Sequence, residues 1–151
     1  MRGAVAYFQG QFTHAVDAKG RLIIPASFRE LLGDRVVLAR GAIDPCIDAY
    51  PLETWVAISA AAQSMPLSSP AARRFNRMRF GHSAEVPFDG MGRVLLPSFL
   101  RERAGITDRA VIVGANGMFE IWNPDRFDEA SERDFAESDA TYQQTADKYG
   151  V

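Results

Sequence analysis

Hydrophobic and polar positions alternate with a period of two near the start of the chain, where Phe12, His14 and Val16 are separated by single residues. This alternation predicts a strand that ends at Asp17. Three short apolar runs predict further strands, and they cover residues 21–24, 36–39 and 47–50. Because tight turns separate these runs, we expect the strands to pair in antiparallel fashion.

Prolines and glycines mark the helices that the pattern predicts between the strands. Pro25 stands where a short helix would begin, and Gly33 stands where it would end. Pro51 opens a longer helix, which the two prolines of residues 65–70 interrupt. A helical stretch rich in arginine follows this break.

The whole pattern occurs twice, at a spacing of 72 residues. Residues 17–25 read DAKGRLIIP and return as residues 89–97, DGMGRVLLP, and residues 47–50, IDAY, return as FEIW. A module of about 60 residues would be marginal alone, because small domains bury a low fraction of their surface. We therefore expect one pseudo-symmetric domain with a shared core. Its class would be α+β, dominated by a small β-barrel with peripheral helices.

The composition is that of a globular protein, with 47% hydrophobic residues. The single Cys46 excludes an intramolecular disulfide, and its register with Met118 of the second copy predicts a core position. The chain holds no apolar run of signal-peptide or membrane-spanning length. We therefore expect a soluble, cytoplasmic protein without a membrane partner.

The net charge of −2 hides an uneven distribution. Residues 1–103 hold 13 Lys and Arg against 9 Asp and Glu, whereas residues 104–151 hold 4 against 10. A basic part with an acidic end is compatible with a nucleic-acid partner. Within the acidic part, Asn123 is a suitable N-cap for a last helix. Residues 140–151 are so polar that we expect them to fray.

The loop of residues 18–20 predicts a type I turn with Gly20 in the left-handed conformation. Across this turn, Asp17 and Arg21 stand at the facing ends of two strands. One interpretation is an ion pair that only pins the hairpin. The other is that Asp17 holds Arg21, while the loop presents Lys19 and Arg21 to the phosphates of a polyanion.

The second copy favours the nucleic-acid interpretation of these turns. Asp89 and Arg93 repeat the pair at the same spacing. Two equivalent arginine-bearing turns in one molecule would form a single basic surface with two-fold symmetry.

The densest basic cluster consists of Arg73, Arg74, Arg77 and Arg79. At helical spacing Arg77 shares a face with Arg73 and with Arg74. One interpretation of this face is a solvated surface, or a set of bridges to the acidic end of the chain. The other is an auxiliary surface that contacts phosphates.

The residues form no recognisable constellation for catalysis, metal binding or cofactor binding. His14 and His82 lack Cys, Asp or Glu neighbours at ligand spacing. Asp17 and Asp89 each stand near an arginine, which would lower the pKa of the carboxyl, and a general acid needs the opposite shift. No glycine-rich phosphate fingerprint follows a strand. We therefore expect no enzyme activity, no cofactor and no small-molecule ligand.

Residues 8–14, FQGQFTH, lead into residues 17–29, DAKGRLIIPASFR, and this run closely resembles the start of MraZ proteins. The second copies at residues 89–97 and 119–122 match the same pattern, so the resemblance covers most of residues 8–130. The family consists of bacterial transcriptional regulators with two SpoVT-AbrB-type domains in one chain. The resemblance implies a pseudo-two-fold swapped-hairpin barrel. It also implies closed rings that bind repeated promoter boxes ahead of the division and cell-wall gene cluster, usually as a repressor.

Carried over by position, the motif residues of the family are Asp17, Arg21, Asp89 and Arg93. By this resemblance Arg21 is the chief DNA-contacting residue and Lys19 assists it. The chain departs from the family's pattern in three places. It has extra residues before Phe8, Gln9 replaces a commonly basic residue, and Met91 stands where the first turn has Lys19. We expect the first turn to bind DNA more strongly than the second.

The resemblance also divides the chain into four parts. Residues 8–55 and 80–127 would be the two SpoVT-AbrB-type repeats, residues 56–79 a helical connector, and residues 128–151 an acidic C-terminal helix and tail. The expected partners are double-stranded promoter DNA, at the nucleoid, and further copies of the chain. Some aromatic side chains, among them Trp55, Phe127 and Phe135, are candidates for a seam between subunits.

Two alternatives remain open at this point. The chain could be a protein-interaction or assembly module that forms a ring without specific DNA binding. It could also be an antitoxin-like AbrB module, although such proteins usually carry one copy and a disordered toxin-binding tail.

Overall fold

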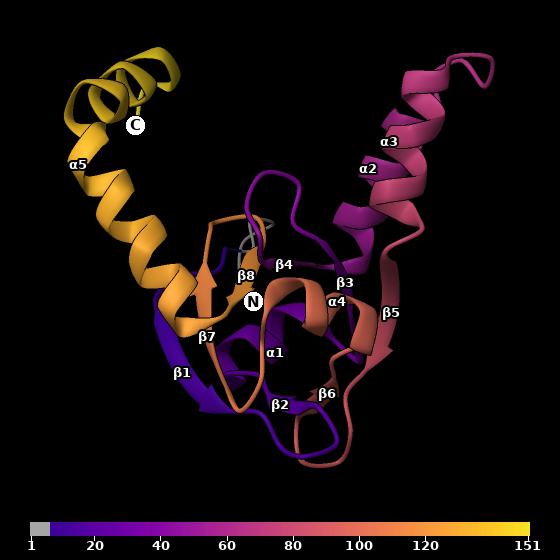
Figure 1. Ribbon diagram of the computed structural model, residues 1–151, viewed down its shortest axis with the longest axis vertical. Coiled ribbons are helices and arrows are strands. Elements are labelled where there is room, and N and C mark those ends of the chain that lie inside the picture. The colour runs from indigo at the N-terminus through magenta and orange to yellow at the C-terminus, as the bar shows by residue number, and fades with distance from the viewer. Residues whose placement is uncertain (1–6) are drawn as a thin grey trace.

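The computed structural model describes residues 7–151, apart from the side chains of residues 138 and 139. The first half contains the strands β1 (Gln11–Ala15), β2 (Arg21–Ile23), β3 (Arg35–Arg40) and β4 (Ile47–Tyr50), with the helices α1 (Ala26–Leu32), α2 (Leu52–Ala62) and α3 (Pro70–Phe80). The second half contains β5 (Ser83–Pro87), β6 (Arg93–Leu95), β7 (Arg109–Gly114) and β8 (Phe119–Trp122), with α4 (Ser98–Ala104) and α5 (Pro124–Tyr149). The predicted α+β class is confirmed, and so are the predicted strands and helices (Figure 1).

The strands of the two halves interleave in one six-stranded antiparallel sheet of order β1-β7-β8-β4-β3-β5. The first strand of each half pairs with the other half, β1 with β7 and β5 with β3. The strands β2 and β6 form a separate two-stranded ribbon. The predicted turn at residues 18–20 forms, but β1 and β2 meet at only one bridge, between Val16 and Leu22. The two strands of this hairpin therefore find their main partners in the other half.

Equivalent residues of the two copies face each other in the strand pairs that join the halves. Leu22 lies opposite Val94 in the ribbon, and Asp48 lies opposite Glu120 in the pair of β4 and β8. Each of these partners is 72 positions away along the chain. The two copies are therefore related by a pseudo-two-fold axis that passes between the strands of both pairs.

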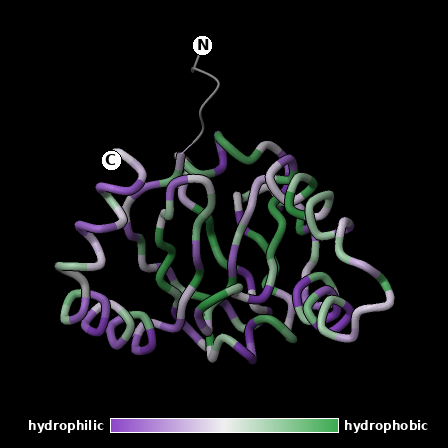
Figure 2. Tube along the Cα trace, turned by 90° about the horizontal axis from the view of Figure 1, so that it is seen from above, coloured by the Kyte–Doolittle hydropathy of each residue, from purple (hydrophilic) through white to green (hydrophobic). Residues whose placement is uncertain are grey.

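The main hydrophobic core serves both halves, as the marginal size of a single copy predicts. Phe28 of the first copy packs against Phe119 of the second, with ring centroids 5.0 Å apart, and Phe8 packs against Phe28 at 5.1 Å. Leu22 and Val94 are buried in the same core. Figure 2 shows hydrophobic residues along the strands between the two helical flanks. Both copies of the repeat therefore contribute side chains to the same core.

The helices α2 and α3 form a hairpin that projects from one side of the sheet, and α5 projects from the other side (Figure 1). The prediction that residues 140–151 fray is wrong, because α5 runs to Tyr149 and closes at Gly150, whose left-handed backbone (φ +70°) lets its N–H donate to the carbonyl of Ala146. Polar residues stabilise an exposed helix when they pair one turn apart, as Gln143 does with Asp147 at 2.8 Å. Within residues 7–151, none of the helices has the length and apolarity that a membrane span requires.

Arg79 does not belong to the basic surface that the sequence predicts for α3. Its side chain is buried and forms an ion pair with Asp48 at 3.3 Å. It also donates hydrogen bonds to the hydroxyl of Tyr50 and to the carbonyl of Arg40, and its guanidinium lies over the ring of Trp55 at 5.3 Å. Arg79 therefore fastens α3 to the sheet.

Candidate nucleic-acid interface

The first turn is organised by the carboxylate of Asp17. One oxygen, Oδ1, accepts hydrogen bonds from the backbone N–H groups of Lys19 and Arg21, both at 2.9 Å. The other, Oδ2, accepts from Nε of Arg21 at 2.6 Å. Gly20 has a φ of +86°, the left-handed conformation that the turn requires. Asp17 thus fixes both the path of the turn and the direction of Arg21.

The second turn repeats this arrangement. Asp89 accepts from the backbone N–H groups of Met91 and Arg93, both at 2.9 Å, and from Nε of Arg93 at 2.8 Å. Asp, Arg and the left-handed glycine before the arginine (Gly20, Gly92) recur in both turns while the other loop residues differ, so these three positions carry the geometry.

Both aspartates are held in the ionised form. The backbone N–H of Arg21 is the main cause of a lowered pKa at Asp17, helped by the side-chain hydrogen bond from the same arginine. The backbone N–H and side chain of Arg93 lower the pKa of Asp89 in the same way. Neither carboxyl is suited to act as a general acid.

The ribbon of β2 and β6 sets the two turns beside each other. Nη1 of Arg93 lies 3.9 Å from Oδ2 of Asp17, so each motif is within ionic reach of the other. Lys19 and Met91 are exposed at the tips of the turns. The structure therefore brings Asp17, Lys19, Arg21, Asp89 and Arg93 to one end of the molecule, at the foot of Figure 1.

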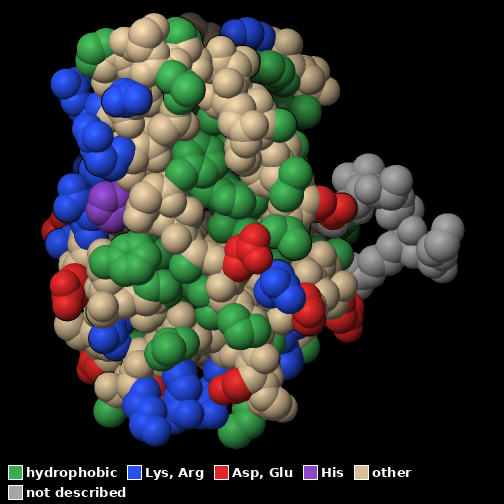
Figure 3. Space-filling view, turned by 90° about the vertical axis from the view of Figure 1, so that its right-hand side faces the viewer, with side chains coloured by type: hydrophobic (Ala, Val, Ile, Leu, Met, Phe, Trp, Pro, Cys, Tyr) green, Lys and Arg blue, Asp and Glu red, His purple; other side chains and the backbone are tan. Residues whose placement is uncertain are grey.

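Arg73, Arg74 and Arg77 are exposed on α3, well apart from the turns. In Figure 3, Lys and Arg side chains gather along the left edge of the upper half, where the α2–α3 hairpin lies, and at the lower end, where the turns lie, with a few others scattered between. The structure does not join these arginines and the turns into one patch.

Sequence reasoning missed two arginines that touch the turns, Arg29 on α1 and Arg101 on α4. A Cβ built on Gly20 would stand 3.0 Å from Cζ of Arg101, and one built on Gly92 would stand 3.0 Å from Nε of Arg29. The signal was present in the sequence, because Arg29 and Arg101 are equivalent positions of the repeat.

A group of potential metal ligands lies away from the turns. Cys46, Asp48 and Glu120 offer ligand atoms within 4.8 Å of one another. Asp48 already accepts from Arg79 and Tyr50, and burial raises the pKa of the Cys46 thiol far above its usual range. The predicted core position of Cys46 is confirmed, and its protonated thiol is unsuited to nucleophilic attack.

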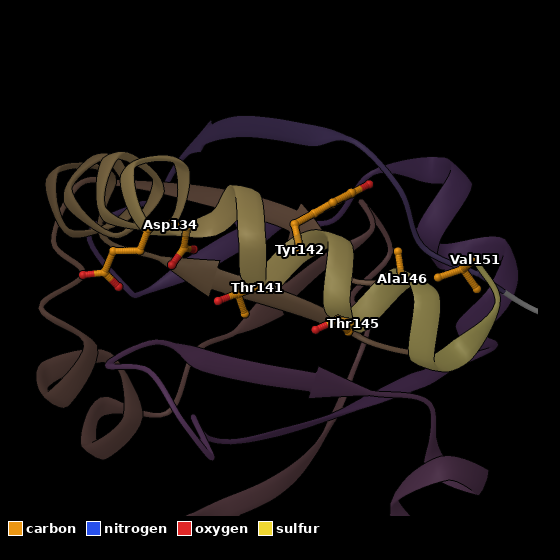
Figure 4. Close-up of a pocket in the computed structure, with 7 residues that line it drawn as sticks. Asp134, Thr141, Tyr142, Thr145, Ala146 and Val151 are labelled. Carbon is orange, nitrogen blue, oxygen red and sulfur yellow. The ribbon is translucent and has the colours of Figure 1, made fainter.

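A shallow pocket lies along the outer part of α5, from Asp134 to Val151 (Figure 4). Two carboxylates, two threonines and Tyr142 line it together with Ala146 and Val151. None of these residues comes from the elements that hold the turns.

Comparison with known proteins gives a consistent family assignment. The family model described as "MraZ protein, putative antitoxin-like" matches the chain twice, over residues 7–78 and 79–149. The "Transcriptional regulator MraZ" of Symbiobacterium thermophilum is 45% identical over 141 residues, which cover 93% of this chain and 99% of that protein. The protein of the same name from Thermomicrobium roseum is 43% identical, covering 92% and 97%, and that of Lactiplantibacillus plantarum is 47% identical, covering 80% and 84%. The chain therefore belongs to the MraZ family, and its matched relatives are named as transcriptional regulators.

Proposed function

We propose that this protein is a transcriptional regulator that binds double-stranded promoter DNA through its two aspartate-ordered turns. The observation that carries the proposal is the pair of equivalent turns, each with an arginine fixed by an aspartate, set side by side on one ribbon. Asp17 uses only Nε of Arg21, so the two terminal nitrogens of that arginine have no acceptor among residues 7–151. Such a guanidinium can contact phosphates or read a guanine edge.

The two turns differ in charge at one exposed position. Lys19 adds a cation to the first turn, whereas Met91 adds none to the second. We infer that Arg21 and Lys19 supply most of the affinity and that Arg93 supplies less, with Asp17 and Asp89 orienting the arginines.

A ring is the assembly that best fits the charges of the two flanks. The helix α5 carries 8 Asp and Glu against 3 Lys and Arg, while α3 exposes Arg73, Arg74 and Arg77 and carries no acid. These helices project from opposite sides of the molecule (Figure 1). A head-to-tail contact between them would repeat from copy to copy and close into a ring if the rotation allows. Phe75 and Phe135 are 47% and 82% exposed and would be covered there.

A ring also explains how turns that each bind DNA weakly could give high overall affinity. Several copies would engage repeated boxes at once, and because the copies are linked, their combined affinity exceeds that of a single copy. We propose that these boxes lie ahead of the division and cell-wall gene cluster, that the outcome is repression, and that the protein acts at the nucleoid. The proposal includes the four-part division of the chain at residues 8–55, 56–79, 80–127 and 128–151. It also includes closure of the sheet and ribbon into a swapped-hairpin barrel.

The exposed arginines of α3 have two candidate partners. As an auxiliary phosphate surface, Arg73, Arg74 and Arg77 would raise affinity for any DNA sequence. The acidic character of α5 favours a second candidate function, a protein-assembly module in which these arginines face a neighbouring copy. The two candidates separate when DNA affinity and molar mass are measured on the same variant.

The deciding experiment measures binding of the full chain to the DNA upstream of its own gene, at moderate salt. Wild type should shift this DNA, and Arg21→Ala should bind it much more weakly. Arg103→Ala, which removes an exposed arginine outside both turns and outside α3 and α5, is the matched control. Equal binding by wild type and Arg21→Ala refutes the proposal. Retention of a stoichiometric protein partner without DNA affinity would support the assembly module instead.

A further inference from the structure

Each turn of the candidate interface is held by contacts with residues of the other repeat. Gly20 of the first turn accepts a hydrogen bond at its carbonyl from the N–H of Leu96, at 2.9 Å. Gly92 of the second turn accepts one from the N–H of Ile24, at 3.1 Å. These residues lie in the strand ends that lead into α4 and α1, so the backbone already links each turn to the opposite copy.

The guanidinium groups of Arg101 and Arg29 extend this crossed arrangement. Arg101 of the second repeat lies against Gly20, and Arg29 of the first repeat lies against Gly92. Both glycines have left-handed backbones, with φ of +86° and +78°. A side chain larger than hydrogen at either glycine would collide with the arginine that covers it.

Neither arginine uses its charge in an ion pair with the residues that the structure describes. The salt bridges of residues 7–151 include other arginines but not Arg29 or Arg101. Nε of Arg29 is buried and has no hydrogen-bond partner among these residues. An unpartnered buried donor costs free energy, so another interaction must keep the side chain in place. Each guanidinium lies against a glycine, and lysine has no planar, multiply donating group to put in its place.

We propose that Arg29 and Arg101 are positioning residues that clamp the two turns crosswise. Arg101 holds the turn that presents Lys19 and Arg21, and Arg29 holds the turn that presents Arg93. This inference rests on the proposed function, because it concerns how the DNA-contacting side chains are ordered before binding. A turn that is ordered in advance loses less conformational entropy when it binds.

The first test separates positioning from direct phosphate contact. Arg101→Lys keeps the charge but loses the planar group, and Arg101→Gln loses both. A positioning role predicts that both variants bind promoter DNA roughly two- to tenfold more weakly, the loss expected when a side chain must be ordered on binding. Their dependence of affinity on salt would match that of wild type. If Arg101→Lys binds like wild type while Arg101→Gln lowers the salt slope by about 0.9, the arginine contacts a phosphate and the proposal is wrong.

The second test examines the crossing by double-mutant cycles. Arg101→Gln should couple more strongly with Arg21→Ala than with Arg93→Ala, so that the combined loss with Arg21→Ala falls further below the sum of the single losses. Arg29→Gln should show the reverse pattern, coupling with Arg93→Ala. A general loss of folding would not produce opposite coupling patterns for the Arg101 and Arg29 variants. Coupling within each repeat, or no coupling, overturns the proposal.

A third measurement does not depend on DNA. Amide hydrogen exchange of Lys19 and Gly20 should accelerate in Arg101→Lys and stay unchanged in Arg29→Lys. If wild type fails to bind any promoter DNA, the proposed function falls, and this exchange pattern still decides whether the clamp exists. Equal exchange in both lysine variants would contradict the clamp.

Discussion

Asp17 and Asp89 each satisfy two backbone N–H groups and one guanidinium nitrogen, which is why the pattern of residues alone predicts their role. The pattern is local, since the hydrogen-bond donors to each carboxylate all lie within four residues of it. The roles of Arg79, Arg29 and Arg101 could not be predicted in this way. Their partners lie in other elements, and only the interleaving of the two halves brings them into contact.

The lowered pKa values of Asp17 and Asp89 predict a pH dependence in acid. Because each pKa in the folded protein lies below its ordinary value of 3.8, the stabilisation from these carboxylates is present above that pH. It is lost as the pH falls through the lowered values. A carboxyl titration by NMR should give both groups midpoints below 3.8, and a midpoint at or above 3.8 for either would contradict the geometry of the turns.

The unequal turns predict a gain of function at Met91. Met91→Lys gives the second turn the cation that the first turn already has, so it should tighten DNA binding and steepen the salt slope by about 0.9. Lys19→Met is the matched control and should do the opposite. Binding isotherms over a salt series measure both slopes. If neither slope changes, the turn tips do not contact phosphates.

At the scale of elements, the attachment of α3 to the sheet depends on one buried ion pair. Arg79→Met leaves the carboxylate of Asp48 buried without its cation, and we expect a loss of about 3–5 kcal/mol in the free energy of unfolding. Asp48→Asn in the same chain should recover part of this loss, because the uncompensated charge is then gone. Urea denaturation measures both variants. A loss below about 1 kcal/mol in Arg79→Met would show that the pair does not hold α3.

The pairing of β4 with β8 places two acids opposite each other. Asp48 faces Glu120 across the strands, and burial is the main cause of a raised pKa at Glu120, with the charge of Asp48 adding to it. A raised carboxyl pKa means that ionisation disfavours the folded state, so this destabilisation grows as the pH rises above the ordinary value of 4.5.

Glu120→Gln should therefore stabilise the protein at neutral pH by about 0.2–1 kcal/mol, the usual size of a cross-strand charge effect. The glutamine keeps an oxygen to accept from the indole N–H of Trp122, which lies 3.0 Å from the glutamate now. Thermal unfolding at pH 7 and pH 4 measures the difference, which should shrink in acid. An equal gain in stability at pH 7 and pH 4 would mean that removal of the Glu120 charge is not its cause.

At the scale of the whole molecule, the repeat predicted a shared core but not which strands pair. Tight turns such as residues 18–20 normally join neighbouring strands, and here they join strands whose longer partners lie in the other copy. Which strands of the two copies pair depends on contacts between residues far apart in the sequence, and a local pattern of hydrophobic and polar residues does not predict these contacts. The polar sequence of residues 140–151 was misleading for a related reason, because an exposed helix needs no apolar face to persist when side-chain pairs and a glycine cap stabilise it.

The opposite charges of the flanks lead to a prediction about assembly. If α3 of one copy meets α5 of the next, reversing charge on either helix should break the assembly through repulsion. Arg74→Glu with Arg77→Glu reverses α3, and Glu132→Lys with Glu137→Lys reverses α5. Each double variant alone should have a lower molar mass than wild type in solution.

Mixing the two variants is the decisive measurement. At one junction the acidic α3 of the first variant faces the basic α5 of the second, and at the next junction the unchanged α3 of the second faces the unchanged α5 of the first. The mixture should therefore regain the wild-type molar mass by light scattering. Arg109→Glu, at an exposed site on β7, is a control for a charge change outside both helices. If each variant alone keeps the wild-type mass but binds DNA weakly with a shallower salt slope, the arginines of α3 contact phosphates and another surface builds the ring.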